Sequence, residues 1–200
     1  MDLAILAGGK SERFGKQKNT LPFGESTLLE FIANRLGSIS KNIIVVKKNG
    51  TEIPPIDGIR IVQDTSEERG AIVGIRTALL ASREKYCFVF ACDMPFLSLE
   101  LIERMIHMDK GYDALVPVHS RGSEPLHAVY SKGCINTIDD CISSGERSLH
   151  SVLSRVRTEY IPAELYCDPE NAFFNINTRD DYERAVRLYL SRREEELCRW

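Results

Sequence analysis

The stretch that decides the fold stands near the amino end of the chain and reads LAILAGGKSERFGKQK over residues 3–18. Residues 3–6 are apolar and lead straight into glycine, so they are predicted to form a buried strand that ends in a loop. Because glycine has no Cβ, Gly8 and Gly9 let backbone N–H groups approach an anion without steric cost. Cations that can neutralise such an anion follow in the same stretch: Lys10, Arg13, Lys16 and Lys18. The stretch therefore predicts a phosphate-binding loop.

This loop differs from the two common phosphate motifs. No Gly-Lys-Ser/Thr follows Gly9, and the glycines are not spaced as GxGxxG. A P-loop hydrolase and a dinucleotide oxidoreductase are therefore not the first expectation. The alternative to phosphate binding is a solvated surface turn. Phe14 and the apolar pair at 22–23 interrupt the polar stretch, which favours a loop folded back onto the domain.

Composition and charge define the broad class of protein. The chain has 200 residues, of which 43% are hydrophobic and 28% charged, as expected for a globular domain with a full core. We expect a single domain over residues 1–190, with 191–200 as a helical extension or tail. The formal net charge of -3 gives no general attraction for nucleic acid. No apolar run approaches membrane-spanning length and no signal sequence follows Met1, so we expect a cytoplasmic protein that binds neither nucleic acid nor membrane.

Beyond the loop, the apolar patterns alternate between those of strands and those of helices. Helices are predicted over 28–36, 72–82, 99–108, 135–142 and from 178 onward, and strands over 43–46, 59–62, 86–91, 114–118, 126–130 and 173–176. Capping boxes are expected for the first helix, from Thr27 and Glu30, and for the last, from Thr178 and Asp181. The alternation predicts an α/β fold, a three-layer sandwich with a mostly parallel, Rossmann-like sheet. Ligands of such sheets lie beyond the carboxyl ends of the strands.

Two carboxylates are predicted to stand at that edge of the sheet. Asp93 follows the most strand-like segment, 86–91, and Asp64 follows the strand at 59–62. Mg²⁺ takes one or two carboxylates and completes its shell with water and phosphate oxygens, so Asp93 alone is chemically sufficient as a protein ligand. Asp64 could serve the ion or hydrogen-bond a nucleotide. The alternative for both residues is a turn-forming or helix-capping role.

Two further pairs of residues are candidates for ligand contacts. Gly70 and Gly74 flank the start of the predicted helix at 72–82, where backbone approaches a base or ribose closely or where a helix simply packs tightly. Asn175 and Asn177 alternate along the predicted strand at 173–176, so they are expected to face the same side and offer their amides to one ligand. Local turns are the alternative for both asparagines.

Taken in order, these motifs resemble the molybdenum cofactor guanylyltransferases. The matching residues are 6–9 (LAGG) with Arg13, Gly15 and Lys18, then Asp64, 70–74, 92–95 (CDMP), 124–126 (EPL) and 174–178 (FNINT). The resemblance covers nearly the whole chain, up to about Leu190. Gln17 stands where the family usually has an acid, and Ala71 where proline often follows glycine. These departures bear on loop conformation and not on the metal ligand.

The resemblance implies a fold of the nucleotide-diphospho-sugar transferase type and a Mg²⁺-dependent reaction. GMP is transferred from GTP to the terminal phosphate of molybdopterin, and pyrophosphate is released. Proteins that deliver or accept the cofactor are further partners that the family implies.

The resemblance also implies a role for each matching residue. Lys18 and Arg13 would hold the triphosphate and Asp93 would bind Mg²⁺, and these are the expected catalytic residues. The nucleotide would be bound by Leu6, Ala7, Gly8, Gly9, Lys18, Asp64, Gly70, Gly74 and Asp93. The acceptor would be bound by Glu124, Pro125, Leu126, Asn175 and Asn177.

Two other functions stay open at this point. A phosphate loop does not read the base, so a transferase that uses CTP, or one with another phosphorylated metabolite as acceptor, fits the same motifs. A module that binds nucleotide or cofactor without catalysis is the alternative from another class, although it has little use for a metal ligand at the reacting phosphate.

Overall fold

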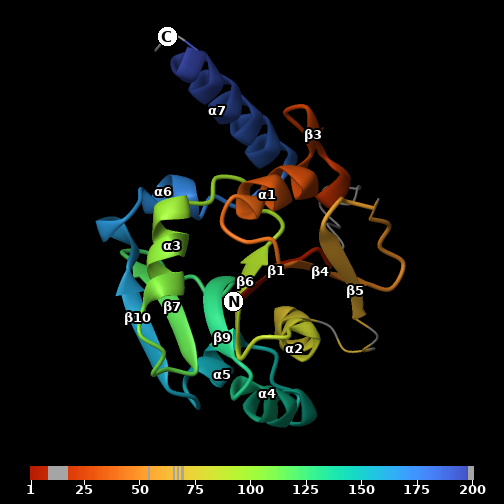
Figure 1. The fold of residues 1–200 in the computed structure, drawn as a ribbon, viewed down its shortest axis with the longest axis vertical. Coiled ribbons are helices and arrows are strands. Elements are labelled where there is room, and N and C mark those ends of the chain that lie inside the picture. The colour runs from red at the N-terminus through yellow and green to blue at the C-terminus, as the bar shows by residue number, and fades with distance from the viewer. Residues whose placement is uncertain (9–17, 54, 65, 67, 69, 198–200) are drawn as a thin grey trace.

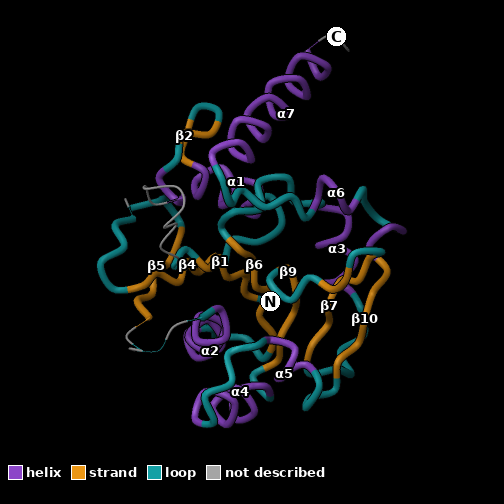
Figure 2. Tube along the Cα trace, turned by 180° about the vertical axis from the view of Figure 1, so that it is seen from behind, coloured by secondary structure: helices purple, strands orange, loops and turns teal. Residues whose placement is uncertain are grey.

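The structure is a computed structural model that describes residues 1–8, 18–53, 55–64, 66, 68 and 70–197. Its centre is an eight-stranded sheet in the order β10-β7-β9-β6-β1-β4-β5, with β8 paired to β7, and Figure 2 shows these strands side by side. The strands are β1 (Asp2–Leu6), β4 (Ile43–Lys48), β5 (Ile59–Asp64), β6 (Tyr86–Ala91), β7 (Ala114–His119), β8 (Gly122–Ser123), β9 (His127–Ser131) and β10 (Thr158–Pro162).

Helices cover both faces of the sheet, which confirms the predicted three-layer α/β sandwich (Figure 1). One face carries α1 (Leu28–Gly37), α3 (Leu99–His107), α6 (Pro169–Ala172) and the start of α7 (Arg179–Leu197). The other carries α2 (Ala71–Ala81), α4 (Cys134–Ser143) and α5 (Leu149–Leu153). Short 3-10 turns, η1 (Lys18–Thr20) and η2 (Ala163–Leu165), and a small hairpin of β2 (Pro22–Phe23) and β3 (Ser26–Thr27) complete the described elements.

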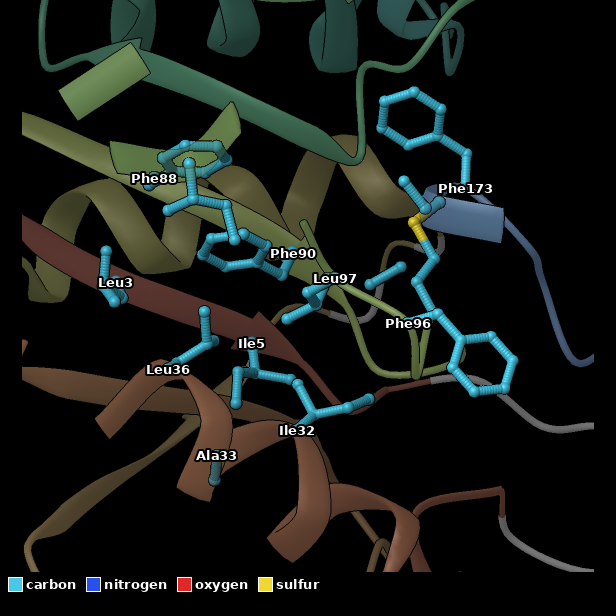
Figure 3. Close-up of a cluster of buried hydrophobic side chains, with 14 of the residues drawn as sticks. Leu3, Ile5, Ile32, Ala33, Leu36, Phe88, Phe90, Phe96, Leu97 and Phe173 are labelled. Atoms are coloured by element: carbon cyan, nitrogen blue, oxygen red, sulfur yellow. The ribbon is translucent and has the colours of Figure 1, made fainter. Parts of the chain in front are cut away.

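Side chains on β1 alternate between two cores, because successive residues of a strand point to opposite faces. Leu3 and Ile5 pack in the core under α1, where Figure 3 shows Ile5 beside Ile32 of that helix, whereas Ala4 packs toward α2. Both faces of β1 are therefore buried, as the continuous apolar run predicted.

The capping boxes predicted from the sequence are both present. The Thr27 hydroxyl accepts from the Glu30 N–H at 3.3 Å, while the Glu30 carboxylate accepts from the Thr27 N–H at 2.8 Å. The same exchange joins Thr178 and Asp181 at the start of α7, at 2.8 and 3.2 Å. These side chains replace the hydrogen bonds that the first turn of a helix lacks.

The sheet is mostly parallel, as predicted, with β8 and β9 running antiparallel to their neighbours. β1 runs parallel to both β4 and β6, while β9 runs antiparallel to β6 and to β7. The chain goes from β1 outward to β4 and β5, then returns to place β6 on the other side of β1. This is a topological switch point, where the loops that leave two neighbouring strands part and open a crevice.

One predicted strand is wrong. Residues 173–176 form a loop between α6 and α7. The Ile176 N–H donates a hydrogen bond to the carbonyl of Asp93, just beyond β6, at 2.9 Å. Their apolar pattern arises because Phe173 and Ile176 are buried in the core under α6 and α7. The sequence pattern also missed β10, since only Ile161 of its residues is buried.

The helix α7 projects from the body of the molecule (Figure 1). Its anchor is aromatic: the Tyr189 ring lies 5.2 Å from that of Phe23 and 5.4 Å from that of Phe31. None of the helices in the described part of the chain is long and apolar enough to cross a membrane.

Gly24, in the β2–β3 turn, tests this anchor. Its φ is +64°, and a Cβ there would lie 2.7 Å from the Tyr189 hydroxyl. We expect Gly24→Ala to lower the free energy of unfolding by more than the cost of the left-handed conformation alone, which is about 1 kcal/mol. Gly50→Ala is the matched control, because Gly50 has φ +77° and open space around it. Urea denaturation measures both variants, and equal losses would contradict the packing of Tyr189 on this turn.

Candidate active site

The carboxyl ends of β1 and β6 lie side by side at the switch point. Leu6 is in register with Ala91, and the Cys92 N–H donates to the Leu6 carbonyl at 3.3 Å. Beyond this pair the two chains diverge, β1 into Ala7 and Gly8 and β6 into Asp93. The glycine-rich loop and the predicted metal ligand therefore leave the sheet as neighbours.

Three predicted site residues meet at this point from distant parts of the chain. The Lys18 ammonium donates to Asp93 Oδ2 and to Asn177 Oδ1, each at 2.9 Å. Lys18 is held in η1, where the buried Asn19 amide donates to the Glu52 carbonyl at 3.1 Å. The side chains of Lys18 and Asp93 are only 15% and 20% exposed, so their attraction is screened less than that of a surface pair.

The Asp93 carboxylate has one oxygen left for a ligand. Oδ1 is buried and accepts no hydrogen bond from the residues that the structure describes, although Oδ2 is bound by Lys18. Burying a carboxylate oxygen without a partner is unfavourable, and a divalent cation would satisfy it. No cluster of three or more His, Cys, Asp or Glu among the described residues could hold an ion alone. Such an ion would therefore need oxygens from water and substrate, as Mg²⁺ sites commonly do.

Asp64 lies at the end of β5 and is engaged with protein groups. It is 2% exposed, and its Oδ1 accepts from the Ser66 N–H at 3.1 Å and from the Thr77 hydroxyl at 3.4 Å. Its Oδ2 lies 3.4 Å from the ammonium of Lys48. The ion pair with Asp64 fixes the Lys48 side chain. A Cβ on Gly8 would lie only 2.8 Å from Lys48 Cγ, so the Lys48 side chain excludes any side chain at position 8. A contact between Asp64 and nucleotide stays a prediction.

The two glycines near α2 differ in their surroundings. Gly74 packs against β1, because a Cβ there would lie 3.2 Å from Leu6 Cδ1. This is the tight helix packing that the sequence left as one of two alternatives. Gly70 immediately precedes α2, and a Cβ added to it would lie within 4 Å of the Arg147 side chain. Its contact with base or ribose stays a prediction. Gly9 and Arg13 lie outside the described residues, as do Lys10 and Lys16.

Three of the predicted acceptor residues, Glu124, Pro125 and Leu126, lie across β6 from β1. Leu126 joins them to it, since its carbonyl accepts from the Ala91 N–H at 3.0 Å. The Pro125 carbonyl accepts from the Tyr130 hydroxyl at 2.7 Å, which fixes the turn before β9. Glu124 accepts from His119 Nε2 at 3.0 Å.

The expectation that Asn175 and Asn177 face the same side of a strand is wrong, because residues 173–176 form a loop. That both contact the acceptor stays a prediction. The Asn175 amide donates to the Phe173 carbonyl at 3.1 Å, a local turn, and the residue lines a cavity with Glu124. Asn177 instead accepts from Lys18. The two asparagines thus border two adjoining regions.

The cavity beside Asn175 contains residues to which the sequence assigned no role. It has a volume of about 440 Å³, and His119, Arg121 and Arg184 are among the residues that line it. His119 lacked metal-ligand spacing, and Arg184 stands on a helix with many other charges. Only the packing of α7 beside the β7–β9 connection brings them together, so no local signal could have found them.

Cysteine and the buried histidine supply no alternative chemistry near this site. Desolvation raises the pKa of the Cys92 thiol to about 12, so it carries a proton near neutral pH and is a poor nucleophile. Burial lowers the pKa of His127 to about 3, and its neutral ring packs edge-on against Phe88 and Phe90. Among the described residues of this region, neither group is therefore an alternative to Lys18 and Asp93, whose catalytic roles stay predictions.

Comparisons with known proteins show the family to which the chain belongs. The model of the MobA-like NTP transferase domain matches residues 3–160. A protein of Pelotomaculum thermopropionicum named "Probable molybdenum cofactor guanylyltransferase" is 36% identical over 187 residues, which cover 90% of this chain and 89% of that protein. The crystal structure of molybdopterin-guanine dinucleotide biosynthesis protein A from Archaeoglobus fulgidus has a TM-score of 0.80 at 27% identity, covering 96% of this chain and 100% of that one.

A more distant likeness shows the fold alone. A Mycobacterium tuberculosis protein, crystallised as a complex with manganese, has a TM-score of 0.61 at 18% identity over 93% of this chain and 97% of its own. The family model, by contrast, spans β1, β6 and the turn at Glu124, the elements that carry most of the candidate site. The chain therefore belongs to the family of MobA-like NTP transferase domains and is a nucleotidyltransferase.

Proposed function

We propose that the protein transfers GMP from GTP to the terminal phosphate of molybdopterin and releases pyrophosphate, with Mg²⁺ bound at Asp93. The observation that carries this proposal is the meeting of Lys18 with Asp93 at the switch point, where Asp93 Oδ1 has no partner among the described residues. The names of curated relatives that match this chain over nearly its full length support the same reaction.

The charges of the two substrates define what the protein must do. A phosphate nucleophile is already ionised near neutral pH, so no general base is needed. The obstacle is the repulsion between two polyanions and the charge that develops on the leaving pyrophosphate. Bound at Asp93, Mg²⁺ would neutralise part of this charge on the phosphate oxygens.

Lys18 supplies the second positive charge. Its ammonium already lies between Asp93 and Asn177 and can donate to a triphosphate oxygen that enters the same space. The hydrogen bond to the Asn177 amide oxygen orients the ammonium. Because that amide is uncharged, the positive charge of Lys18 is not neutralised by it and can act on a phosphate. The protein thus acts by holding and neutralising the two anions, as phosphoryl-transfer sites generally do.

The choice of nucleotide tests the proposed function itself. A phosphate-binding loop and a metal ligand do not distinguish one base from another. CTP as the donor and another phosphorylated metabolite as the acceptor are therefore the alternatives, and the relatives' names favour GTP. We expect purified protein with molybdopterin and Mg²⁺ to release pyrophosphate and form a dinucleotide with GTP and not with CTP or ATP. Turnover with CTP in place of GTP would contradict the proposal. The cytoplasmic location, the domain boundary at residue 190 and the protein partners stay predictions.

Asp93→Asn removes the charge of the metal ligand while keeping its shape. We expect turnover to fall by roughly a hundredfold to a thousandfold, the range found when a group that stabilises developing charge is removed. The melting temperature should stay near that of the wild type. Asp139→Asn is the control, because Asp139 pairs with Arg76 on the half-exposed surface between α2 and α4. Pyrophosphate release measures all three proteins, and wild-type activity of Asp93→Asn would contradict the assignment.

Lys18→Met removes the ammonium from the site and so tests whether Lys18 and a metal ion compete for Asp93. Without nucleotide, the ammonium 2.9 Å from Asp93 Oδ2 competes with a metal ion for the carboxylate. We expect Lys18→Met to bind Mn²⁺ several-fold more tightly than the wild type when nucleotide is absent, and to bind GTP more weakly. Electron paramagnetic resonance measures free Mn²⁺, and a fluorescent GTP analogue measures nucleotide binding. Lys41→Met, at the exposed amino side of β4, should change neither. Weaker Mn²⁺ binding by Lys18→Met would refute this competition.

A further inference from the structure

The end of β4 lies between the ends of β1 and β5, because the three strands are parallel and β4 is the middle one (Figure 2). Its last residue is Lys48, which is in register with Asp64, the last residue of β5. On its other side β4 stays paired to the chain just beyond β1, since the Ala7 N–H donates to the Val46 carbonyl at 2.8 Å. Lys48 therefore stands where the segments that follow β1 and β5 leave the sheet.

The ammonium of Lys48 is held by the segment that follows β5. It lies 3.4 Å from Oδ2 of Asp64, and it donates a hydrogen bond to the carbonyl of Glu68. That Asp64 oxygen accepts no hydrogen bond from any residue in the described part of the chain, and the Asp64 side chain is 2% exposed. A buried carboxylate oxygen without a hydrogen bond needs a positive charge nearby. Lys48 supplies that charge.

The carbon stem of Lys48 restricts the chain that follows β1. A Cβ on Gly8 would lie 2.8 Å from Lys48 Cγ, closer than packed carbon atoms approach each other. Cγ is at the near end of the side chain, and the far end is bound to Asp64 and Glu68. The stem cannot turn away without breaking those contacts. Gly8 is therefore matched to Lys48 and leaves no space for a larger residue.

A second ion pair joins the segment after β5 to the end of α4. The carboxylate of Glu68 pairs with Arg147, whose guanidinium also donates to the Ile142 carbonyl at 2.9 Å. The side chains of Arg147 and Glu68 are 34% and 50% exposed, against 28% and 2% for Lys48 and Asp64. Solvent screens the pair of Arg147 with Glu68 more, so the pair of Lys48 with Asp64 is the stronger of the two.

We propose that Lys48 is a positioning residue of the nucleotide site, an inference that rests on the proposed function. It holds Gly8 and Asp64, two of the residues predicted to bind nucleotide, in fixed places on either side of β4. By neutralising Asp64 it also keeps a buried negative charge from repelling the triphosphate. Lys48 touches no reacting atom in this role, because its ammonium is engaged with Asp64 and Glu68.

Two substitutions of Lys48 and a matched control test the role of its charge. Lys48→Met keeps most of the stem and removes the charge, and Lys48→Arg keeps a charge. Lys47→Met is the control, because Lys47 carries the same charge at the neighbouring position and donates to the Thr51 carbonyl at 3.1 Å instead. Initial rates of pyrophosphate release give the KM for GTP and for molybdopterin. Titration with a fluorescent GTP analogue gives nucleotide binding without turnover.

We expect Lys48→Met to raise the KM for GTP and the Kd of the analogue about tenfold to a hundredfold, the effect of leaving a charged group without its partner. The KM for molybdopterin and kcat should stay within about twofold, because Lys18 and Asp93 keep their contacts. Lys48→Arg should recover most of the affinity, and Lys47→Met should match the wild type. An unchanged Kd of the analogue in Lys48→Met would overturn the positioning role.

Asp64→Asn distinguishes positioning from direct contact with the nucleotide. Without the charge on Asp64, Lys48 has no carboxylate to neutralise, so adding Lys48→Met to Asp64→Asn should weaken analogue binding by at most about twofold. A loss of equal size in both backgrounds would mean that the Lys48 ammonium binds the nucleotide itself, and would overturn the positioning role. The double variant leaves no buried charge unpaired at this place. If it folds where Lys48→Met alone does not, the neutralisation of Asp64 by Lys48 is supported.

Gly8→Ala tests the carbon stem without any ligand. In the wild-type background its Cβ meets Lys48 Cγ at 2.8 Å, whereas the next nearest atoms, Lys48 N and Cβ, lie at 3.4 and 3.5 Å and remain in Lys48→Ala. We expect Gly8→Ala to lower the urea midpoint of the wild type and to leave that of Lys48→Ala nearly unchanged. Equal shifts in the two backgrounds would overturn the packing of Lys48 on Gly8.

The outcomes for the charge variants are distinct from the failure of the proposed function. If the wild type releases no pyrophosphate from GTP and molybdopterin, the proposed function fails. Binding of the analogue that depends on Lys48 through Asp64 would still support the positioning role in that case. If the wild type turns over GTP and Lys48→Met keeps the wild-type KM for GTP, the positioning role is overturned and the function stands.

Discussion

The parallel pairing of β1 with β6 is the constraint on which the rest of the site depends. It brings Leu6 beside Ala91 and lets the two chains part directly beyond them. Because β4 and β5 extend the sheet in one direction and β9, β7 and β10 in the other, the strand order reverses at this pair, the place where ligands of open α/β sheets bind. Ala7 and Gly8 leave the sheet beside Cys92 and Asp93 for this reason, although at least 84 positions of sequence separate the two pairs. Every later contact, including that of Lys18 with Asn177, is built on this junction.

Much of the fold could be predicted from the chain because the relevant signals are local. Thr27 with Glu30 and Thr178 with Asp181 begin helices through side chains three residues apart, and the apolar run of β6 reflects burial on both faces. Residues 173–176 could not be predicted this way. Their apolar side chains fill a core between helices, and burial in a loop leaves the same pattern as burial in a strand.

The residues of the site also differ in whether a local sequence signal could predict them. Lys18 and Asp93 could be singled out because each stands in a distinctive local setting, a run of cations and the end of a central strand. Arg184 and His119 could not, since one is an ordinary charge on a polar helix and the other an ordinary strand residue. What distinguishes them is the docking of α7 and of the loop before it against the β7–β9 connection, a tertiary event that no spacing encodes.

The reversed direction of β9 has a consequence for how such a protein can change. Since β7 runs with β6 and β9 runs against both, the whole excursion from His119 through Glu124 to His127 emerges at the catalytic edge and returns there. Lengthening or rewriting this excursion would cost the two-residue pairing of β8 with β7 but leave the pairing of β9 with β6 in place, along with Leu6, Asp93 and Lys18. The architecture is thus modular: under the proposed function, the side expected to bind the acceptor can change in sequence while the side expected to bind the triphosphate stays fixed.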